Sequence, residues 1–344
     1  MAYEVTIGIP VYNVEKYIRE SLESALAQSF QSIEFLICDD CGTDSSIAIV
    51  QEFQNVHPRG ADIRIVHQSH NMGLGCARNR MIEEAKGRYI YFMDSDDLLA
   101  SNAIELMYEQ AQKYDADMVY GSMEKVLLYE NGRRVKNSDY SYRVFLQEDE
   151  FASWVYEKYD RIQASTCNFL IRIDVYRQNG IKYKPINYWE DFTTTMDLPT
   201  YVTRVVMLND VTYFYMCRSG SMSNYQYREY IPKEEILQTM NAVAMIKENS
   251  KRILEKPYFS NRMLKVMTTC FFICCTILRN RYKIEPKFDK KELRDFMHYP
   301  VAFHNFLSFR TCLLKHVLLY SMGVLPAFLS VGIMCVIGKN KHLV

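Results

Sequence analysis

Three carboxylates lie within four residues at Asp94-Ser95-Asp96-Asp97, directly after the apolar run of residues 89–93. That run predicts a buried strand. Carboxylates grouped beside a buried strand are costly unless another charge compensates them. Mg²⁺ and Mn²⁺ take oxygen ligands and usually share their sites with substrate phosphates. The stretch therefore indicates metal-assisted chemistry on a phosphorylated substrate, and a polar turn beside a helix cap is the alternative.

The elements that must position these carboxylates alternate between strand and helix over residues 1–120. Apolar runs of strand length occur at residues 5–9, 33–38, 63–66, 89–93 and 118–120. Amphipathic segments between them predict helices, for which we expect Asn13, then Asp44 or Thr43, and later Ser101 as caps. This order predicts an α/β fold with a mostly parallel, Rossmann-like sheet and flanking helices. After Pro232 the sequence is largely helical in character.

Polar side chains follow three of the predicted strands. They are Tyr12 with Asn13, Asp39 with Asp40, and the acidic residues of 94–97. In doubly wound sheets, ligands bind beyond the carboxyl ends of the strands. We therefore expect these side chains to converge on one site.

Five segments, in this order, resemble the family 2 glycosyltransferases, which are nucleotide-sugar enzymes of the GT-A fold. They are residues 5–13 (VTIGIPVYN), 33–46 (IEFLICDDCGTDSS), 71–80 (NMGLGCARNR), 89–99 (YIYFMDSDDLL), and Trp189-Glu190-Asp191 followed by 218–223 (RSGSMS). The resemblance covers roughly residues 3–225. It implies a GT-A domain that performs inverting sugar transfer, with the acidic stretch as the family's DxD motif.

By the resemblance, the nucleotide is bound by residues at the ends of the first two predicted strands and by a residue on the helix after the glycine loop. Pro10 and Tyr12 would pack against the base, and Asp40 would accept a hydrogen bond from a base imide, which uracil offers and cytosine does not. A capping role for Asp40 is the alternative. Arg78 would pair with phosphate or a base edge, unless it is a surface arginine.

Two glycines and one departure from the family pattern bear on the same end of the site. The Gly73 and Gly75 loop resembles a phosphate cradle, although no Gly-Lys-Ser/Thr follows it as in a P-loop. The family usually has Gly-Ser where this chain has Cys41-Gly42. A side chain at position 41 could shift the loop that aims Asp40.

In the DxD motif, the resemblance makes Asp96 the direct ligand of Mn²⁺ or Mg²⁺. Asp94 would contact ribose or metal-bound water and would count as a second metal residue. Ser95 lies between them in the donor site. Asp97 is expected to support the loop.

The acceptor end is assigned to Asp191 as catalytic base, with Glu190 beside it. A carboxylate there would deprotonate the acceptor hydroxyl for a single inverting displacement. An acidic N-cap pair before a helix at 192–198 is the compatible alternative. Arg218 and Ser221 resemble a loop that closes over the diphosphate, and an ordinary polar turn is the alternative.

Composition limits the partners. Lys plus Arg and Asp plus Glu are both 41, so nucleic acid is not expected as an electrostatic partner. The ten cysteines show no zinc-ligand spacing, which predicts reduced, buried thiols in a cytosolic protein. The chain starts almost directly with a strand, so we expect no signal peptide.

Residues 317–338 carry no charge, and Lys339 and Lys341 follow them. That length could span a bilayer once. Two short helices at the cytoplasmic membrane surface fit the interrupting glycines and proline better, and a buried helix pair is the alternative. We expect a catalytic domain at 1–225, a helical extension at 226–309 and a membrane-associated tail at 310–344.

Together these features predict a peripheral or monotopic glycosyltransferase on the cytoplasmic face of a membrane. Its donor would be a nucleotide-sugar, most simply a UDP-sugar, and its acceptor a lipid-linked or growing surface glycan. One alternative is a nucleotidyltransferase, which would want a glycine-rich basic loop where this chain has PVYNVEKY. The other is a nucleotide-sugar-binding scaffold without catalysis.

Overall fold

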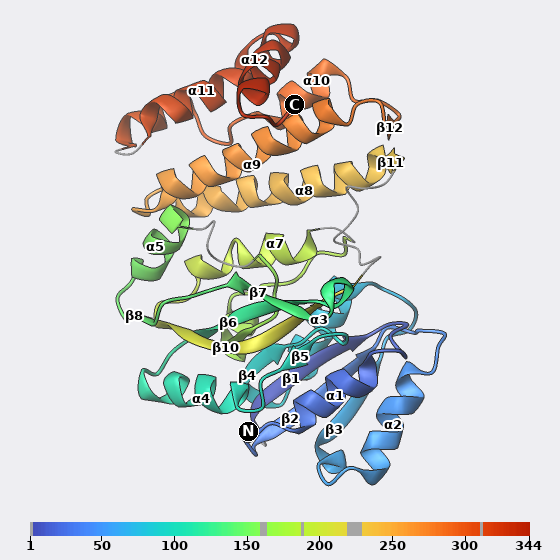
Figure 1. Ribbon diagram of the computed structural model, residues 1–344. Coiled ribbons are helices and arrows are strands. Elements are labelled where there is room, and N and C mark those ends of the chain that lie inside the picture. The colour runs from blue at the N-terminus through green and yellow to red at the C-terminus, as the bar shows by residue number, and fades with distance from the viewer. Residues whose placement is uncertain (1–2, 159–163, 187–188, 219–228, 310–311) are drawn as a thin grey trace. The chain divides into compact units, whose positions relative to one another are not determined.

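The computed structural model describes residues 3–158, 164–186, 189–218, 229–309 and 312–344 (Figure 1). The chain divides into two compact units. The first comprises Met1–Phe151 with Lys158–Met222, and the second Ala152–Glu157 with Ser223–Val344. Each unit is described by itself.

The first unit is built on one mixed sheet, which within the described residues has 10 strands. Its main path runs β3 (Ile63–His67), β2 (Ile33–Asp39), β1 (Tyr3–Val11), β4 (Gly87–Phe92), β9 (Phe169–Arg172), β6 (Met118–Leu127), β10 (Val205–Cys217) and β5 (Leu98–Leu99). Two further strands extend it, β7 (Arg133–Ser138) on β6 and β8 (Arg143–Phe145) on β10. The sheet confirms the predicted α/β fold.

The sheet is mixed in strand direction, because β9 is reversed against both of its neighbours and β5, β7 and β8 are each antiparallel to the strand they pair with. β1, β2, β3 and β4 are parallel, β9 is antiparallel to both β4 and β6, and β6 and β10 are parallel again. β1 is buried from Val5 to Val11, as expected for a strand covered on both faces. Pro10 lies in it beyond Gly8, where the pairing with β4 ends, so its missing N–H leaves no ladder bond unmade.

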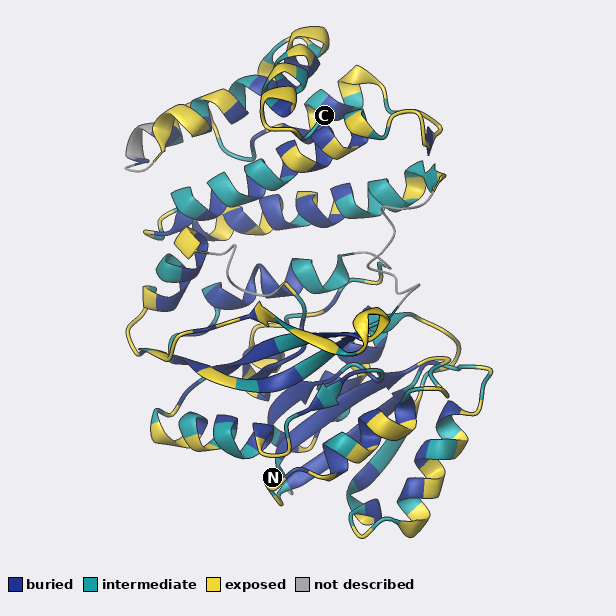
Figure 2. Ribbon diagram, in the orientation of Figure 1, coloured by how far each residue is buried: buried dark blue, intermediate teal, exposed yellow. Residues whose placement is uncertain are grey.

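Helices flank this sheet, and most of them expose their outer faces, whereas α7 (Glu190–Thr195) has no exposed residue (Figure 2). The flanking helices are α1 (Ile18–Leu26), α2 (Ser46–Val56), α3 (Leu74–Glu84), α4 (Ala103–Lys113), α6 (Ile173–Gln178) and α7 (Glu190–Thr195). α5 (Glu150–Lys158) contributes its central residues to the second unit.

Two of the predicted caps are wrong. Asn13 adopts a left-handed conformation, with φ 52°, and its Oδ1 accepts the Thr43 N–H at 2.7 Å, so it joins two loops and caps no helix. α4 starts after Asn102 without a side-chain cap, so Ser101 is not one. Asp44 does act at the start of α2, where its Oδ1 accepts the Ser46 N–H at 3.0 Å.

The second unit is helical, as predicted for the C-terminal region. It contains α8 (Lys233–Ser250), α9 (Phe259–Arg279), α10 (Lys290–Phe296), α11 (Leu313–Val324), α12 (Ala327–Asn340) and the short pair β11 (Ile231–Pro232) and β12 (Ile284–Glu285). Buried Arg262 of α9 is satisfied within this unit, donating to Ser250 Oγ at 3.0 Å and to Tyr156 Oη at 2.6 Å.

The uncharged run of residues 317–338 does not form one helix. It is divided between α11 and α12 at Leu325-Pro326, where Leu325 is extended, because proline cannot continue a helix and disfavours helix in the residue before it. A single C-terminal span over that run is therefore wrong. Among the described helices only α9 is long and apolar enough to cross a membrane, and 56% of its apolar window is buried in the protein.

The cysteines are all free. Cys38, Cys167, Cys270, Cys274 and Cys275 are buried as expected. Cys312 is exposed, because it precedes α11 outside that helix's packed face, so the prediction that every thiol is buried is wrong.

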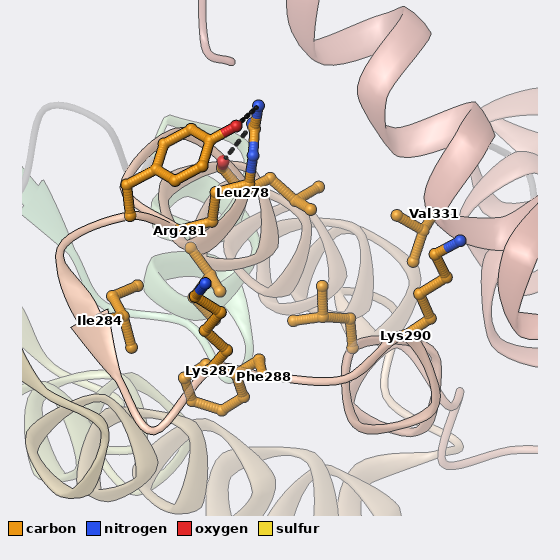
Figure 3. Close-up of a pocket in the computed structure, with 10 residues that line it drawn as sticks. Leu278, Arg281, Ile284, Lys287, Phe288, Lys290 and Val331 are labelled. Carbon is orange, nitrogen blue, oxygen red and sulfur yellow. Dashed lines mark hydrogen bonds between the residues drawn. The ribbon is translucent and has the colours of Figure 1, made fainter.

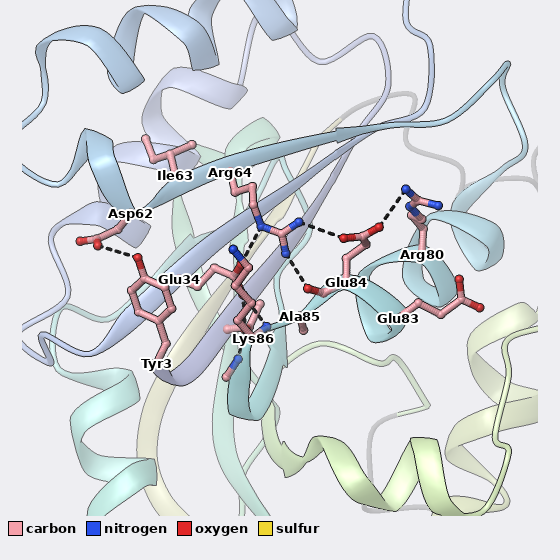
Figure 4. Close-up of polar contacts among 12 residues, drawn as sticks. Tyr3, Glu34, Asp62, Ile63, Arg64, Arg80, Glu83, Glu84, Ala85 and Lys86 are labelled. Atoms are coloured by element: carbon pink, nitrogen blue, oxygen red, sulfur yellow. Dashed lines mark hydrogen bonds and ion pairs between the residues drawn. The ribbon is translucent and has the colours of Figure 1, made fainter. Parts of the chain in front are cut away.

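A buried carboxylate in β2 ties the parallel strands together (Figure 4). Glu34 Oε1 accepts Arg64 Nε at 2.9 Å, and Glu34 Oε2 accepts Thr6 Oγ1 at 2.7 Å and the Lys86 N–H at 2.8 Å. Arg64 continues to Glu84 Oε2 at 3.1 Å. The network connects β1, β2 and β3 with the end of α3 and the entry to β4.

Replacing Glu34 by glutamine removes the negative charge opposite Arg64. It also places an amide N–H group where a carboxylate oxygen now accepts hydrogen bonds from other donors. We expect the free energy of unfolding, measured by urea denaturation, to fall by about 2–3 kcal/mol, because hydrogen bonds to charged groups contribute about that much. Glu52→Gln is the matched control, because its pair with Arg19 has side chains 48% and 54% exposed and should contribute under about 1 kcal/mol. Equal losses would contradict the assignment.

Candidate active site

The carboxyl ends of three parallel strands meet at one edge of the sheet, with β1 between β2 and β4. These ends place Tyr12, Asp40 and the acidic segment 94–97 along that edge. β9 runs antiparallel to β4, so Thr166, which precedes β9, lies at the same edge. The expected convergence of polar residues is thus met by the topology.

Arg78 of α3 lies at the centre of this site and is 1% exposed. Its Nη1 pairs with Asp191 and lies 3.4 Å from Glu190 Oε1, and its Nη2 lies 3.4 Å from Asp94 Oδ1. Burial opposes the charge on Arg78, but Asp191 and Asp94 outweigh it and raise the pKa of Arg78, so the guanidinium stays cationic. One buried cation therefore links the proposed base to the acidic segment.

The segment GLGCARNR, which contains Arg78, contacts the backbone at Tyr183 and Lys184, a few residues before Glu190 and Asp191. A Cβ on Gly75 would lie 2.4 Å from the Lys184 carbonyl oxygen, so glycine allows that close approach. The Asn79 side chain bonds the Tyr183 backbone in both directions, at 2.8 Å each. Gly75 is the second residue of α3, and Gly73 precedes the helix with φ 84°.

The acidic segment divides into inward and outward carboxylates. Asp97 is buried and accepts Tyr213 Oη at 2.7 Å and the Met216 N–H at 2.8 Å. The Asp94 N–H donates to the same phenol oxygen at 3.2 Å. Burial, and then the charges of Asp94 and Asp96, raise the pKa of Asp97. Asp97 therefore supports the loop, as expected, and leaves Asp94 and Asp96 facing outward.

Asp94 and Asp96 have side chains 35% and 39% exposed. Burial raises the pKa of Asp96, and the Arg218 charge offsets only part of that rise. Arg218 Nη1 donates to Asp96 Oδ2 at 3.0 Å, and its guanidinium lies 4.1 Å from the centre of the Tyr17 ring. Ser95 is buried between the two acids. Ser221 lies outside the described residues.

At the opposite end, Pro10 is buried inside β1 and Tyr12 is 46% exposed just beyond it. Asp40 is buried, and its two oxygens accept the Met72 and Gly73 N–H groups at 2.8 and 2.9 Å. Each oxygen keeps a further acceptor site. Cys41 has φ 59°, so this chain places a non-glycine residue in the left-handed conformation where glycine fits most easily.

The acidic pair at the start of α7 is partly buried and held by a residue that sequence reasoning missed. Thr166 donates its Oγ1 to Asp191 Oδ1 at 2.9 Å and its N–H to Asp191 Oδ2 at 3.2 Å. Burial, and then the Asp191 charge, raise the pKa of Glu190 to about 7. Burial also raises the pKa of Asp191, while Arg78 acts against that rise. The pair therefore takes up a proton more readily than free carboxylates do.

Glu190 and Asp191 are the first two residues of α7, and the N-cap position is Trp189, which makes no side-chain cap bond. The alternative of an acidic N-cap pair is therefore wrong. Tyr213 and Tyr17 were also missed. The only available signal for Thr166 was its polar neighbourhood before the strand at 169–172, and no motif marks it.

The family assignment follows from the match over the site itself. Residues 6–180, which include Tyr12, Asp40, Arg78 and the acidic segment, match the family model described as Glycosyl transferase family 2. The chain belongs to glycosyl transferase family 2. This chain is thus a glycosyltransferase enzyme, which sets aside the nucleotidyltransferase and the inactive scaffold.

One curated relative of this glycosyltransferase is the glycosyltransferase GlyG of Streptococcus pneumoniae serotype 4. It is 29% identical over 240 residues, which cover 66% of this chain and 75% of that protein. Two other relatives are much longer, because the match covers only 16% of the glycosyltransferase GlyA of Streptococcus pneumoniae serotype 4 and 15% of the chondroitin synthase of Escherichia coli. The family is therefore shared with proteins of very different length.

Two solved structures resemble this glycosyltransferase in fold. S. aureus TarS in complex with UDP-GlcNAc has a TM-score of 0.64 at 20% identity, covering 93% of this chain and 90% of that chain. The mannosyltransferase PcManGT of Pyrobaculum calidifontis, in complex with GDP-Man and Mn²⁺, has a TM-score of 0.51 at 13% identity, covering 100% and 82%. The likeness shows the GT-A fold.

Replacing Arg78 by methionine leaves three carboxylates without their buried cation. We expect this glycosyltransferase to lose about 3–5 kcal/mol of unfolding free energy at neutral pH, as when one partner of a buried ion pair is removed. Without Arg78 the carboxylates bind protons more readily when folded than when unfolded. Their repulsion is therefore relieved as pH falls, and the loss should be smaller at pH 5.5 than at pH 7.5.

Urea denaturation at both pH values measures this difference. Arg80→Met is the matched control, because Arg80 lies on the same helix, is 44% exposed and, among the described residues, forms an ion pair only with Glu84. It should cost under about 0.5 kcal/mol. A loss in Arg78→Met that does not change with pH would contradict the role given to the guanidinium.

Proposed function

We propose that this glycosyltransferase moves a sugar from a UDP-sugar to a hydroxyl of a lipid-linked or growing surface glycan, with inversion and with help from a divalent metal. The observation that supports it best is the joining of Asp94, Glu190 and Asp191 by the buried Arg78. Arg78 thereby holds Asp94, which could bind a metal ion, close to Asp191, which could act as a base, at one edge of the sheet.

The donor proposal rests on the order of groups along that edge. Tyr12 offers an exposed ring and Asp40 a buried acceptor at one end, and the outward acids lie at the other. A nucleotide bound along the edge would have its base near Asp40 and its diphosphate near Asp94 and Asp96. TarS and PcManGT were solved with UDP-GlcNAc and GDP-Man, which supports a nucleotide-sugar and leaves the base to experiment.

The residues present fit Mn²⁺ or Mg²⁺. Asp94 and Asp96 are partly exposed oxygen ligands, and no group of three His, Cys, Asp or Glu side chains suited to a metal occurs in the described part of the chain. Two carboxylates are what these ions usually take from a protein, with water and substrate phosphate completing the shell. When bound, the ion would neutralise charge on the departing diphosphate.

Arg218 adds a second positive group at the diphosphate end. It contacts Asp96 and rests on Tyr17, and it directly precedes the segment that holds Ser221. A guanidinium there can bind phosphate oxygens. We propose that Arg218 and Ser221 contact the donor diphosphate.

Asp191 is proposed as the base for the acceptor hydroxyl, and Glu190 as the neighbour that sets its proton affinity. Thr166 and Arg78 fix the orientation of Asp191. We further propose a catalytic region at 1–225, an extension at 226–309, and a tail at 310–344 that contacts the cytoplasmic surface of a membrane. Exposed apolar side chains in α11 and α12 support that contact.

Replacing Asp96 by asparagine keeps the shape of the side chain and removes the charge expected to bind the metal. Thermal-shift measurements with UDP-, GDP-, CDP- and dTDP-sugars plus Mn²⁺ should give the largest stabilisation with the UDP-sugar in the unsubstituted protein, because bound ligand stabilises the folded state. In Asp96→Asn this metal-dependent shift should disappear, and UDP release should fall by about 100-fold or more.

The control for that experiment is Asp139→Asn, because Asp139 is 54% exposed and pairs with Lys136. It should behave like the unsubstituted protein. Undiminished UDP release in Asp96→Asn would contradict the metal assignment, and a larger shift with another nucleotide-sugar would correct the donor.

The raised pKa of Glu190 predicts a pH dependence of turnover. A base must be unprotonated, so kcat/KM should fall as pH drops through about 7, where the coupled pair takes up a proton. Glu190→Gln removes a like charge beside Asp191, so Asp191 should lose its proton more readily and the acid limb should move to lower pH. Glu83→Gln, at an exposed position, should leave the profile unchanged, and an unmoved limb in Glu190→Gln would count against Asp191 as base.

A further inference from the structure

The second unit contains a pocket of about 230 Å³ between the end of α9, the β12 turn, α10 and α12 (Figure 3). Its interior is apolar, with Ile277, Ile284, Leu293 and Val331 among the lining side chains. Sites that enclose whole small molecules usually measure about 300–1,000 Å³. This pocket is therefore sized for part of a larger ligand and not for a complete nucleotide-sugar.

Three cationic side chains line the same pocket and no acidic one does. They are Arg281, Lys287 and Lys290, and Figure 3 shows Lys287 directed toward the middle of the ring of side chains and Lys290 on the Val331 side. Among the described residues no ion pair is formed between these three and a carboxylate. Arg281 is oriented by hydrogen bonds to the Leu278 carbonyl at 3.0 Å and to Tyr282 Oη at 3.1 Å.

The acids nearby are already engaged or point elsewhere. Asp289 caps α10, accepting the Lys291 and Glu292 N–H groups at 2.7 and 2.8 Å. Glu292 pairs with Lys233 at 2.6 Å, and Lys233 lies 4.6 Å from the centre of the Phe288 ring that forms one wall. Glu285 is exposed and does not line the pocket. Among the described residues, these acids therefore form no ion pair with Arg281, Lys287 or Lys290, which are all exposed to solvent.

α12 also carries exposed apolar side chains outside the pocket. Val331 lines the pocket, and the same helix exposes Phe328 at 63%, Leu329 at 44% and Val336 at 62%. α11 exposes Leu314 at 85%. Exposed apolar side chains in a unit that also carries exposed cationic groups are typical of proteins that lie at the interface of an anionic membrane.

We propose that this pocket binds an anionic membrane phospholipid, with its phosphate against Arg281, Lys287 and Lys290 and the first carbons of one chain against Ile277, Ile284 and Leu293. The apolar side chains of α11 and α12 then enter the same bilayer surface. A free phosphate would satisfy only the cations, and an uncharged lipid only the interior, so the pocket selects a ligand with both. The proposal extends the membrane contact proposed above and does not depend on the donor or on Asp96.

The test is co-sedimentation of the full chain with vesicles of phosphatidylcholine alone and of phosphatidylcholine mixed equally with phosphatidylglycerol. The unsubstituted protein should bind the mixed vesicles and bind the neutral ones weakly. Lys287→Gln with Lys290→Gln should lower the partition coefficient by roughly 30-fold, from about fivefold per basic residue near an anionic surface. Inorganic phosphate at vesicle-phosphate concentration should not displace the protein, because it lacks the chain.

Lys182→Gln with Lys291→Gln is the matched control, because it removes the same charge from exposed lysines outside the pocket. A loss equal to that of the pocket variant would show general electrostatic attraction and overturn the site. Displacement by inorganic phosphate, or no binding to either vesicle, would overturn it too. Asp96→Asn should bind vesicles normally, so failure here and failure of the donor proposal are separated by retained or lost metal-dependent stabilisation with UDP-sugar.

Discussion

The buried guanidinium of Arg78 is the interaction on which the candidate site depends. Asp94, Glu190 and Asp191 come from segments far apart in the sequence, and bringing such charges together under partial burial is unfavourable without a cation between them. Arg78 meets that requirement from the first turns of α3. Gly75 and Asn79 of the same helix hold the backbone at Tyr183 and Lys184, so one helix both compensates the acids and fixes the chain that delivers two of them.

A second constraint separates supporting carboxylates from available ones. Tyr213 of β10 accepts from the Asp94 N–H and donates to Asp97. This locks the acidic segment with Asp97 inward, so Asp94 and Asp96 must face the open edge of the sheet. The same strand then ends beside Asp96 and presents Arg218 to it. The geometry of the acidic segment is thus set largely by β10, a strand more than a hundred residues later.

The second unit solves a different physical problem. It carries a long apolar sequence without burying all of it, because Pro326 breaks the run into two helices that each pack one face. Large apolar side chains remain exposed on both. The cationic pocket beside α12 gives that exposed surface a preferred partner, an anionic amphiphile, and a reason for cations that lack carboxylate partners among the described residues.

The sequence by itself determined the α/β class, the alternation of strands and helices over residues 1–120, and the polar residues that follow three of the strands, because these follow from short-range periodicity and from the rule that parallel strands end at one edge. It also located Asp97 as a supporting residue. The sequence did not determine which residues contact one another through hydrogen bonds, ion pairs or close packing. The sequence predicts Asn13 as a cap, whereas Asn13 joins two loops, and the sequence does not reveal that Gly75 allows a close backbone contact. Arg78 was expected at phosphate and lies among carboxylates, and Thr166 and Tyr213 carried no motif at all. Only tertiary structure decided these, because a hydrogen bond or ion pair between residues a hundred positions apart leaves no periodic trace in the chain, and because burial, which raises the pKa of Glu190, is a property of the packed molecule.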